Sequence, residues 1–143
     1  MYSILIPVGT AEAGVSRAVE TVESFPGQGE LSVIVVHVSS DIDFVGSDGS
    51  YVSIDHEELT VPGAVEDTVS AFDDRGIPVE LMVREGEPVD EILEIIDEEA
   101  IDHVIIPDKR RSPVGKVFFG GTTLSLIRDS VAPVTVVPAI ETE

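Results

Sequence analysis

Short runs of valine and isoleucine alternate with amphipathic segments along this chain, and this alternation constrains the fold more than any other feature. The runs lack a clean change from apolar to polar at every second residue, which is typical of parallel strands buried on both faces. Strands that alternate with helical patterns predict an α/β domain with an open parallel sheet. Five runs are predicted as strands: residues 2–8, 31–39, 78–84, 102–107 and 132–138.

The segments between these runs carry apolar residues at helical spacing. Residues 15–22, 65–72 and 89–96 each present one apolar face, which we assign to the core rather than to a ligand. Pro88 suits the first turn of the third helix, and Gly76 suits the position just past the end of the second.

The chain is predicted to form one domain, residues 1–143, and its charge is unusual for that size. Eight basic and 28 acidic residues give a net charge of −20. Molar salt screens such self-repulsion by shortening the Debye length to ~3 Å. We interpret the charge as adaptation to the salty cytoplasm of a halophilic organism; an acidic, solvated surface in an ordinary cell is the competing interpretation. Nucleic acid is not an expected partner, because phosphate binding needs clustered positive charge.

Several classes of chemistry lack their sequence patterns. No apolar run approaches the ~20 residues of a membrane span, so a cytoplasmic protein without such a span is expected. The chain has no cysteine, no nucleophile elbow of the Gly-x-Ser-x-Gly type and no Gly-x-x-x-x-Gly-Lys-Ser/Thr loop. His37, His56 and His103 are too scattered for a metal motif; His37 is placed to line a crevice, and His103 to be structural. We expect neither a catalytic centre nor a metal site.

One loop concentrates positive charge where an α/β sheet holds its ligands. It precedes a last helix, predicted from about Gly121 to Ser130. Ligands of open α/β sheets bind beyond the carboxyl ends of the strands, and a helix N-terminus there favours an anion. Four of the eight basic residues lie in this loop: Lys109, Arg110, Arg111 and Lys116. The candidate site residues are Val8, Gly9, Thr10, Lys109, Arg110, Arg111, Gly120, Gly121, Thr122 and Thr123.

Structural roles compete with these functional ones. Gly120 and Gly121 suit a tight turn, and either of the threonines that follow suits the cap of the last helix. The basic residues are equally suited to ion pairs with nearby carboxylates such as Asp102 and Asp108.

The segment from Ile105 to Val137 resembles the C-terminal signature of the universal stress protein family. That signature is a strand, Gly-x-x-Gly, nine residues, Gly-Ser/Thr, a helix, and a strand ending in Pro-Val-x-Val-Val; this chain closes with Pro133-Val-Thr-Val-Val137. The resemblance extends to residues 4–8 and 84–92. It implies the fold of adenine-nucleotide alpha-hydrolases: a five-stranded parallel sheet of order 3-2-1-4-5 with helices on both faces. It also implies an adenine pocket near Val38.

The chain departs from the family's ATP-binding pattern at four positions. Pro107 and Arg110 stand at the two Gly-x-x-Gly positions, Gly121 stands where Ser or Thr is usual, and Gly9 replaces an acidic residue. Proline removes an amide donor, and arginine strains a position that wants positive φ. We therefore expect a degraded ATP-binding motif.

The resemblance implies a dimeric stress-response or regulatory protein without catalytic activity. We expect homodimerisation through the last strand, at Val134, Val136 and Val137, because its outer edge must be paired or protected. The alternative is a sensor that binds a nucleotide or another anion through basic side chains of residues 109–116. ATP or another adenine nucleotide would then be the ligand, although no cofactor is certain. A third hypothesis is a stand-alone relative of the regulatory domains attached to membrane transporters. The sequence names no other protein partner.

Overall fold

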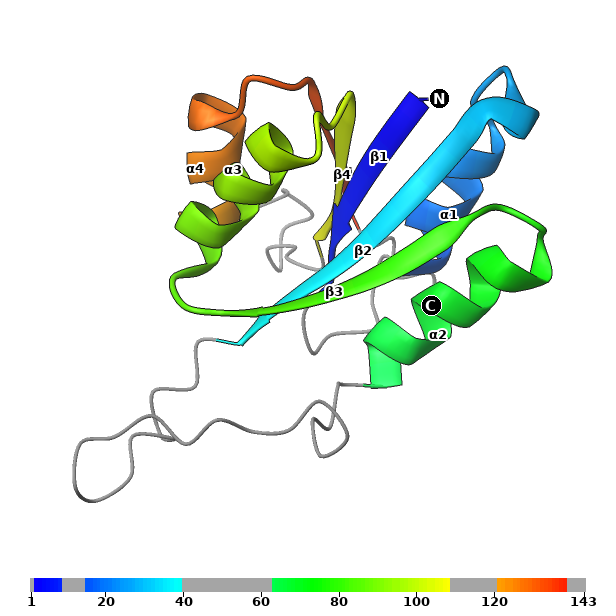
Figure 1. Cartoon of the computed structure of the whole chain (residues 1–143), viewed down its shortest axis with the longest axis horizontal. Coiled ribbons are helices and arrows are strands. Elements are labelled where there is room, and N and C mark those ends of the chain that lie inside the picture. Colours follow the sequence, from blue (N-terminus) through cyan, green and yellow to red (C-terminus); the bar gives the residue numbers. More distant parts are fainter. Residues whose placement is uncertain (1, 9–14, 40–62, 109–120, 139–143) are drawn as a thin grey trace, which may run out of the picture.

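The computed structural model describes residues 2–8, 15–39, 63–108 and 121–138 (Figure 1). Strands and helices alternate along these residues, as the alternation of apolar runs predicts. The strands are β1 (Tyr2–Pro7), β2 (Leu31–Ser39), β3 (Val79–Glu85), β4 (His103–Asp108) and β5 (Val134–Pro138). The α-helices are α1 (Val15–Glu23), α2 (Gly63–Asp74), α3 (Pro88–Glu98) and α4 (Gly121–Asp129), and a 3-10 turn, η1 (Gln28–Glu30), precedes β2.

The strands form one parallel five-stranded sheet in the order β3-β2-β1-β4-β5. This order confirms the one that the family resemblance implies. Ile4 of β1 pairs with Val33 of β2 on one side and with His103 of β4 on the other. The last strand begins two residues later than predicted. Pro133 has no backbone N–H for the ladder, and its carbonyl accepts a hydrogen bond from Val104 N at 2.9 Å.

The sheet is covered on both faces, and each face has its own apolar core (Figure 1). Successive residues of a strand point to opposite faces. In β1, Ile4 and Ile6 therefore pack with α1 and α2, whereas Leu5 packs with α3 and α4. Phe72 of α2 is the largest of the fully buried side chains. Two buried faces explain why the strands read as continuous apolar runs.

Two of the helices end in the same backbone motif. After α2, Gly76 adopts the left-handed backbone conformation, with a φ of 71°. Its N–H donates to Asp73 O at 3.0 Å, and Ile77 N donates to Phe72 O at 3.0 Å. This is a Schellman motif, which satisfies carbonyls left open at the end of a helix. The prediction that Gly76 ends the helix is confirmed, as is that of Pro88 in the first turn of α3.

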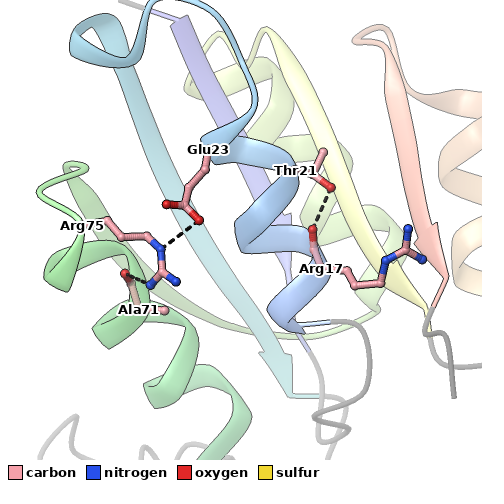
Figure 2. A network of polar contacts seen from close by, with 5 residues as sticks. All are labelled: Arg17, Thr21, Glu23, Ala71 and Arg75. Carbon is pink, nitrogen blue, oxygen red and sulfur yellow. Dashed lines mark hydrogen bonds and ion pairs between the residues drawn. The ribbon is translucent and has the colours of Figure 1, made fainter. Parts of the chain in front are cut away.

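One exposed ion pair joins the ends of the two helices on the first face. Figure 2 shows Arg75, just beyond α2, reaching Glu23 at the end of α1. The Nε atom of Arg75 lies 3.0 Å from Glu23 Oε1, and its Nη1 donates to Ala71 O at 2.8 Å. Both side chains are about 40% exposed, at 40% and 43%, so the pair contributes at most ~1 kcal/mol.

Candidate functional site

The carboxyl edge of the sheet carries the candidate site, and it begins at the ends of β1 and β2. Val8 follows β1, is 4% exposed and packs in the core under α1 and α2. Val38, near the end of β2, is partly buried against the opposite core, under α3 and α4. These two valines therefore mark opposite faces of the sheet at one edge. A ligand that reached both would lie across the end of the sheet.

His37 ties these two strand ends together. Its Nδ1–H donates to the carbonyl oxygen of Val8 at 3.0 Å, and Val8 N donates to Val36 O at 2.9 Å. The ring therefore extends the β1–β2 connection past the last residue of β1. His37 lies near the carboxyl end of β2, as predicted, and its lining of a crevice stays a prediction; the sequence did not predict its bond to Val8. In the sequence, the position of His37 in the predicted second strand, one residue before Val38, indicates that it lies at this edge of the sheet.

The N-terminus of α4 supplies three candidate residues: Gly121 and Thr122 are exposed, whereas Thr123 is only 7% exposed. Gly121 does not have a positive φ, and a Cβ built on it meets no described atom within 4 Å. Neither backbone conformation nor packing within the described part of the chain therefore requires glycine there. Glycine at such a position lets the backbone approach a ligand closely. The first-turn amides of α4 and its dipole favour an anion in that space.

The other candidate residues, Gly9, Thr10, Lys109, Arg110, Arg111 and Gly120, lie outside the described residues. Of the two carboxylates suggested as partners for the basic loop, Asp108 ends β4 and directly precedes it. Asp102 precedes the other end of β4, and its carboxylate accepts a hydrogen bond from Ser3 N at 2.9 Å. Six residues of strand separate the two by ~20 Å. Asp102 therefore lies at the opposite edge of the sheet from the end of β4, where the basic loop begins.

A separate polar cluster occupies the amino edge, on the face that α1 covers. The ring of His103 lies between two hydroxyl groups: Tyr2 Oη is 3.1 Å from Nδ1, and Thr135 Oγ1 is 2.7 Å from Nε2. Phe25 packs edge-on against the ring at a centroid distance of 5.4 Å. Burial lowers the pKa of His103. Because both ring nitrogens have partners, the cluster joins β1, β4 and β5, and the structural role expected for His103 agrees with this arrangement.

No group of three or more histidine, aspartate or glutamate side chains within residues 2–8, 15–39, 63–108 and 121–138 could hold a metal ion. The helices of these same segments are too short or too polar to cross a membrane. What the carboxyl edge offers is backbone amides, hydroxyl groups and one imidazole, which suit an anionic or nucleotide ligand.

Comparison with known proteins agrees with this fold. The model of the universal stress protein family matches residues 1–138. The chain therefore belongs to the universal stress protein family. The comparison with curated proteins finds no match.

Solved structures share the fold over nearly the whole chain. A universal stress protein from Archaeoglobus fulgidus is 24% identical, with a TM-score of 0.71 over 96% of this chain and 98% of that one. The A. fulgidus protein in complex with dAMP is 21% identical, with a TM-score of 0.65 over 96% and 98%. A family protein from Arabidopsis thaliana with AMP bound is 14% identical, with a TM-score of 0.67 over 98% and 93%. Identities this low show the fold alone.

Proposed function

We propose that this chain is a cytoplasmic regulatory protein of the stress response, without a catalytic centre, that acts as a homodimer joined along β5. Its nucleotide site departs from the family pattern at Gly9, Pro107, Arg110 and Gly121. The observation that carries the dimer is the position of β5 at one edge of the sheet, with no charged residue along it. The unpaired backbone groups of an edge strand can form hydrogen bonds with a second chain. Because β5 carries no charged residue, electrostatic repulsion between two copies of charge −20 is smaller along this edge.

The three valines of β5 do not contribute equally to this proposal. Val137 is 4% exposed and already packs inside the core of its own chain. Val134 and Val136 are partly exposed. We therefore assign the contact between copies to Val134 and Val136 and to the backbone edge of the strand.

Val136→Asp tests this dimer directly. Two aspartates would face each other across a two-fold axis, so the variant should be monomeric by light scattering in molar KCl. Because Val136 is partly exposed, the far-UV circular dichroism should stay that of the parent. A variant that remains dimeric would contradict pairing along β5.

An adenine-nucleotide sensor is the second candidate, favoured by the fact that no described atom packs against Gly121 at the start of α4. Relatives of the same fold have been solved with AMP, dAMP and cAMP. In this chain, basic side chains such as Arg110 and Arg111 would compensate for the amide donor that Pro107 lacks and for the strain that Arg110 places on the family's glycine loop.

Calorimetric titration of AMP and ATP in molar KCl distinguishes the two candidates. Saturable heat would support the sensor, and its absence from folded protein would remove it. Gly121→Ala should weaken binding roughly tenfold, the loss of about one charge-assisted hydrogen bond, because its methyl group fills the approach to the helix. Alanine is the better helix former, so stability should not fall. The double variant Arg110→Ala/Arg111→Ala should also bind more weakly and keep its fold.

A further inference from the structure

Strand β3 forms the edge of the sheet opposite β5, and its outer side pairs with no strand in the described part of the chain (Figure 1). It pairs with β2 without a break from Val79 to Glu85. Its seven residues make it longer than β5, which has five, so it presents more unpaired backbone. It carries neither a proline nor a bulge, two of the devices that protect an edge strand. The edge is therefore regular enough to accept a further strand.

The ladder between β2 and β3 determines which backbone groups face outward. Val33 N donates to Pro78 O at 2.9 Å, and Gly86 N donates to Ser39 O at 3.0 Å. Because the backbone groups of successive residues in a strand point in opposite directions, the even-numbered residues between Pro78 and Gly86 bond to β2. The outward N–H and C=O groups are those of Val79, Leu81, Val83 and Glu85.

One face of this edge offers apolar side chains. Val79 packs with the core under α1 and α2, whereas Met82 packs with the core under α3 and α4. Since side chains alternate along a strand, Leu81 and Val83 lie on the same face as Val79, the face that α2 covers. Leu81 is 38% exposed and Val83 is partly exposed. Apolar contact area therefore lies next to the unpaired backbone groups.

The other face of the edge is acidic. Arg84 lies on it, with Nη1 at 3.7 Å from Glu91 Oε1 and Nη2 at 3.4 Å from Glu98 Oε2, so this flank of α3 lies beside β3. Glu94 is three residues from Glu91 and four from Glu98, which places it on the same flank. We call Glu91, Glu94 and Glu98 the α3 row. A hydrogen bond and repulsion from Glu98, with repulsion from Glu91, raise the pKa of Glu94. One arginine therefore leaves the row with surplus negative charge.

Charge identifies the kind of partner that this edge accepts. Helix α2, on the other face, carries four acidic and no basic residues. A second copy of this chain, of charge −20, would bring the same two acidic helices to the edge and would be repelled. A segment with basic side chains is attracted instead. Because side chains of an added strand also alternate, basic residues at every second position meet the α3 row, and apolar residues between them meet Leu81 and Val83.

We propose that the outer edge of β3 binds an extended segment of a partner protein in which basic and apolar residues alternate. The segment adds a strand to the sheet through backbone hydrogen bonds to the outward groups of β3. Its basic side chains pair with the α3 row, and its apolar side chains pack against Leu81. The alternation, rather than net positive charge alone, distinguishes this partner. The site lies at the opposite edge from β5 and does not depend on the homodimer proposed above.

Two fluorescent peptides of the length of β3 test the proposal on the parent protein. In one peptide lysine and valine alternate; in the other the same residues form two blocks, which keeps the charge and removes the alternation. Binding is measured by fluorescence anisotropy in molar KCl and again in about 0.3 M KCl, where charges are screened less. The alternating peptide should bind saturably, and more tightly at the lower salt concentration. It should bind at least about tenfold more tightly than the block peptide.

Three variants locate the binding site. Glu94→Gln and Glu98→Gln should each raise the dissociation constant of the alternating peptide about threefold in the lower salt. Glu20→Gln, the matched control, removes the same charge from an exposed position of α1, which packs against β4, and should leave the constant unchanged. Leu81→Pro removes an outward N–H and no hydrogen bond to β2, so it should raise the constant at least about tenfold while circular dichroism stays that of the parent.

Each alternative occupant or cause has its own outcome. Equal binding of the two peptides, or an equal effect of Glu20→Gln, would attribute binding to net charge and refute the proposal. Absence of binding to the folded parent would refute it as well, as would unchanged affinity in a folded Leu81→Pro variant. If Leu81→Pro instead changes the oligomeric state without peptide, by light scattering, a second copy of this chain occupies β3 and the basic partner is wrong. The peptide comparison uses the parent protein and does not depend on the folding of any variant.

Discussion

Ala100 adopts a backbone conformation that an alanine side chain disfavours, and replacing it with glycine should stabilise the protein. It follows α3 with a φ of 50°, and among the described residues it is the one non-glycine with positive φ. Glu99 N donates to Ile95 O at 2.9 Å and Ile101 N donates to Ile96 O at 3.1 Å. The same closing geometry follows α2, where glycine occupies the left-handed position. The chain thus ends α2 and α3 with a residue in the left-handed conformation, and glycine, which favours this conformation, occupies it only after α2.

The magnitude follows from two opposing terms. A left-handed conformation costs an L-residue with a Cβ about 1–2 kcal/mol, and glycine avoids this cost. Glycine adds about 0.4–1 kcal/mol of conformational freedom to the unfolded chain. Ala100 is exposed, so no packing is lost. We expect Ala100→Gly to raise the free energy of unfolding by about 0.5–1 kcal/mol, and the midpoint temperature by roughly 2 °C.

The free energies of unfolding of the parent and of Ala100→Gly are compared by urea unfolding in molar KCl. Unfolding is followed by far-UV circular dichroism, which reports the loss of helix. The matched control is Gly76→Ala, which introduces the strain that Ala100 carries and should lower the free energy of unfolding by about 1 kcal/mol. A lower stability for Ala100→Gly, or no effect of Gly76→Ala, would refute the reasoning, because the two sites share one backbone motif.

Two further predictions concern charge. Burial holds the pKa of His103 below its ordinary value, so the folded chain binds a proton less readily than the unfolded chain. Its contribution to stability is complete above the unfolded pKa and is lost as pH falls through that value toward the folded pKa. His103→Gln should therefore lose less stability than the parent between about pH 7.5 and about pH 5.5; equal losses would contradict this. On α3, a hydrogen bond and charge repulsion from Glu98, with repulsion from Glu91, raise the pKa of Glu94. Glu94→Lys should raise the midpoint temperature in dilute buffer and much less in molar KCl, as thermal scans at both salt concentrations would show.

The secondary structure and the fold class could be predicted because they depend on neighbours along the chain. The apolar runs gave each strand to within two residues, and Gly76 and Pro88 marked helix ends through backbone properties of their own. At the candidate site, the sequence placed Gly121 at the start of the last helix and Val8 and Val38 at strand ends, as the structure has them. Positions governed by local spacing and local conformation are therefore determined by the sequence itself.

Contacts between distant segments were decided only by the tertiary structure. Nothing in the local pattern joins His103 to Tyr2, which is 101 residues away, or His37 to the carbonyl of Val8. Asp102 was one of two carboxylates considered as partners for the basic loop because it is near in sequence, yet β4 places it at the opposite edge of the sheet from Asp108. The exposed side of α4 depends on the order of β4 and β5 and on the hand of their connection. Strand order and crossover direction determine which side chains meet, and apolar spacing along one segment carries no information about either.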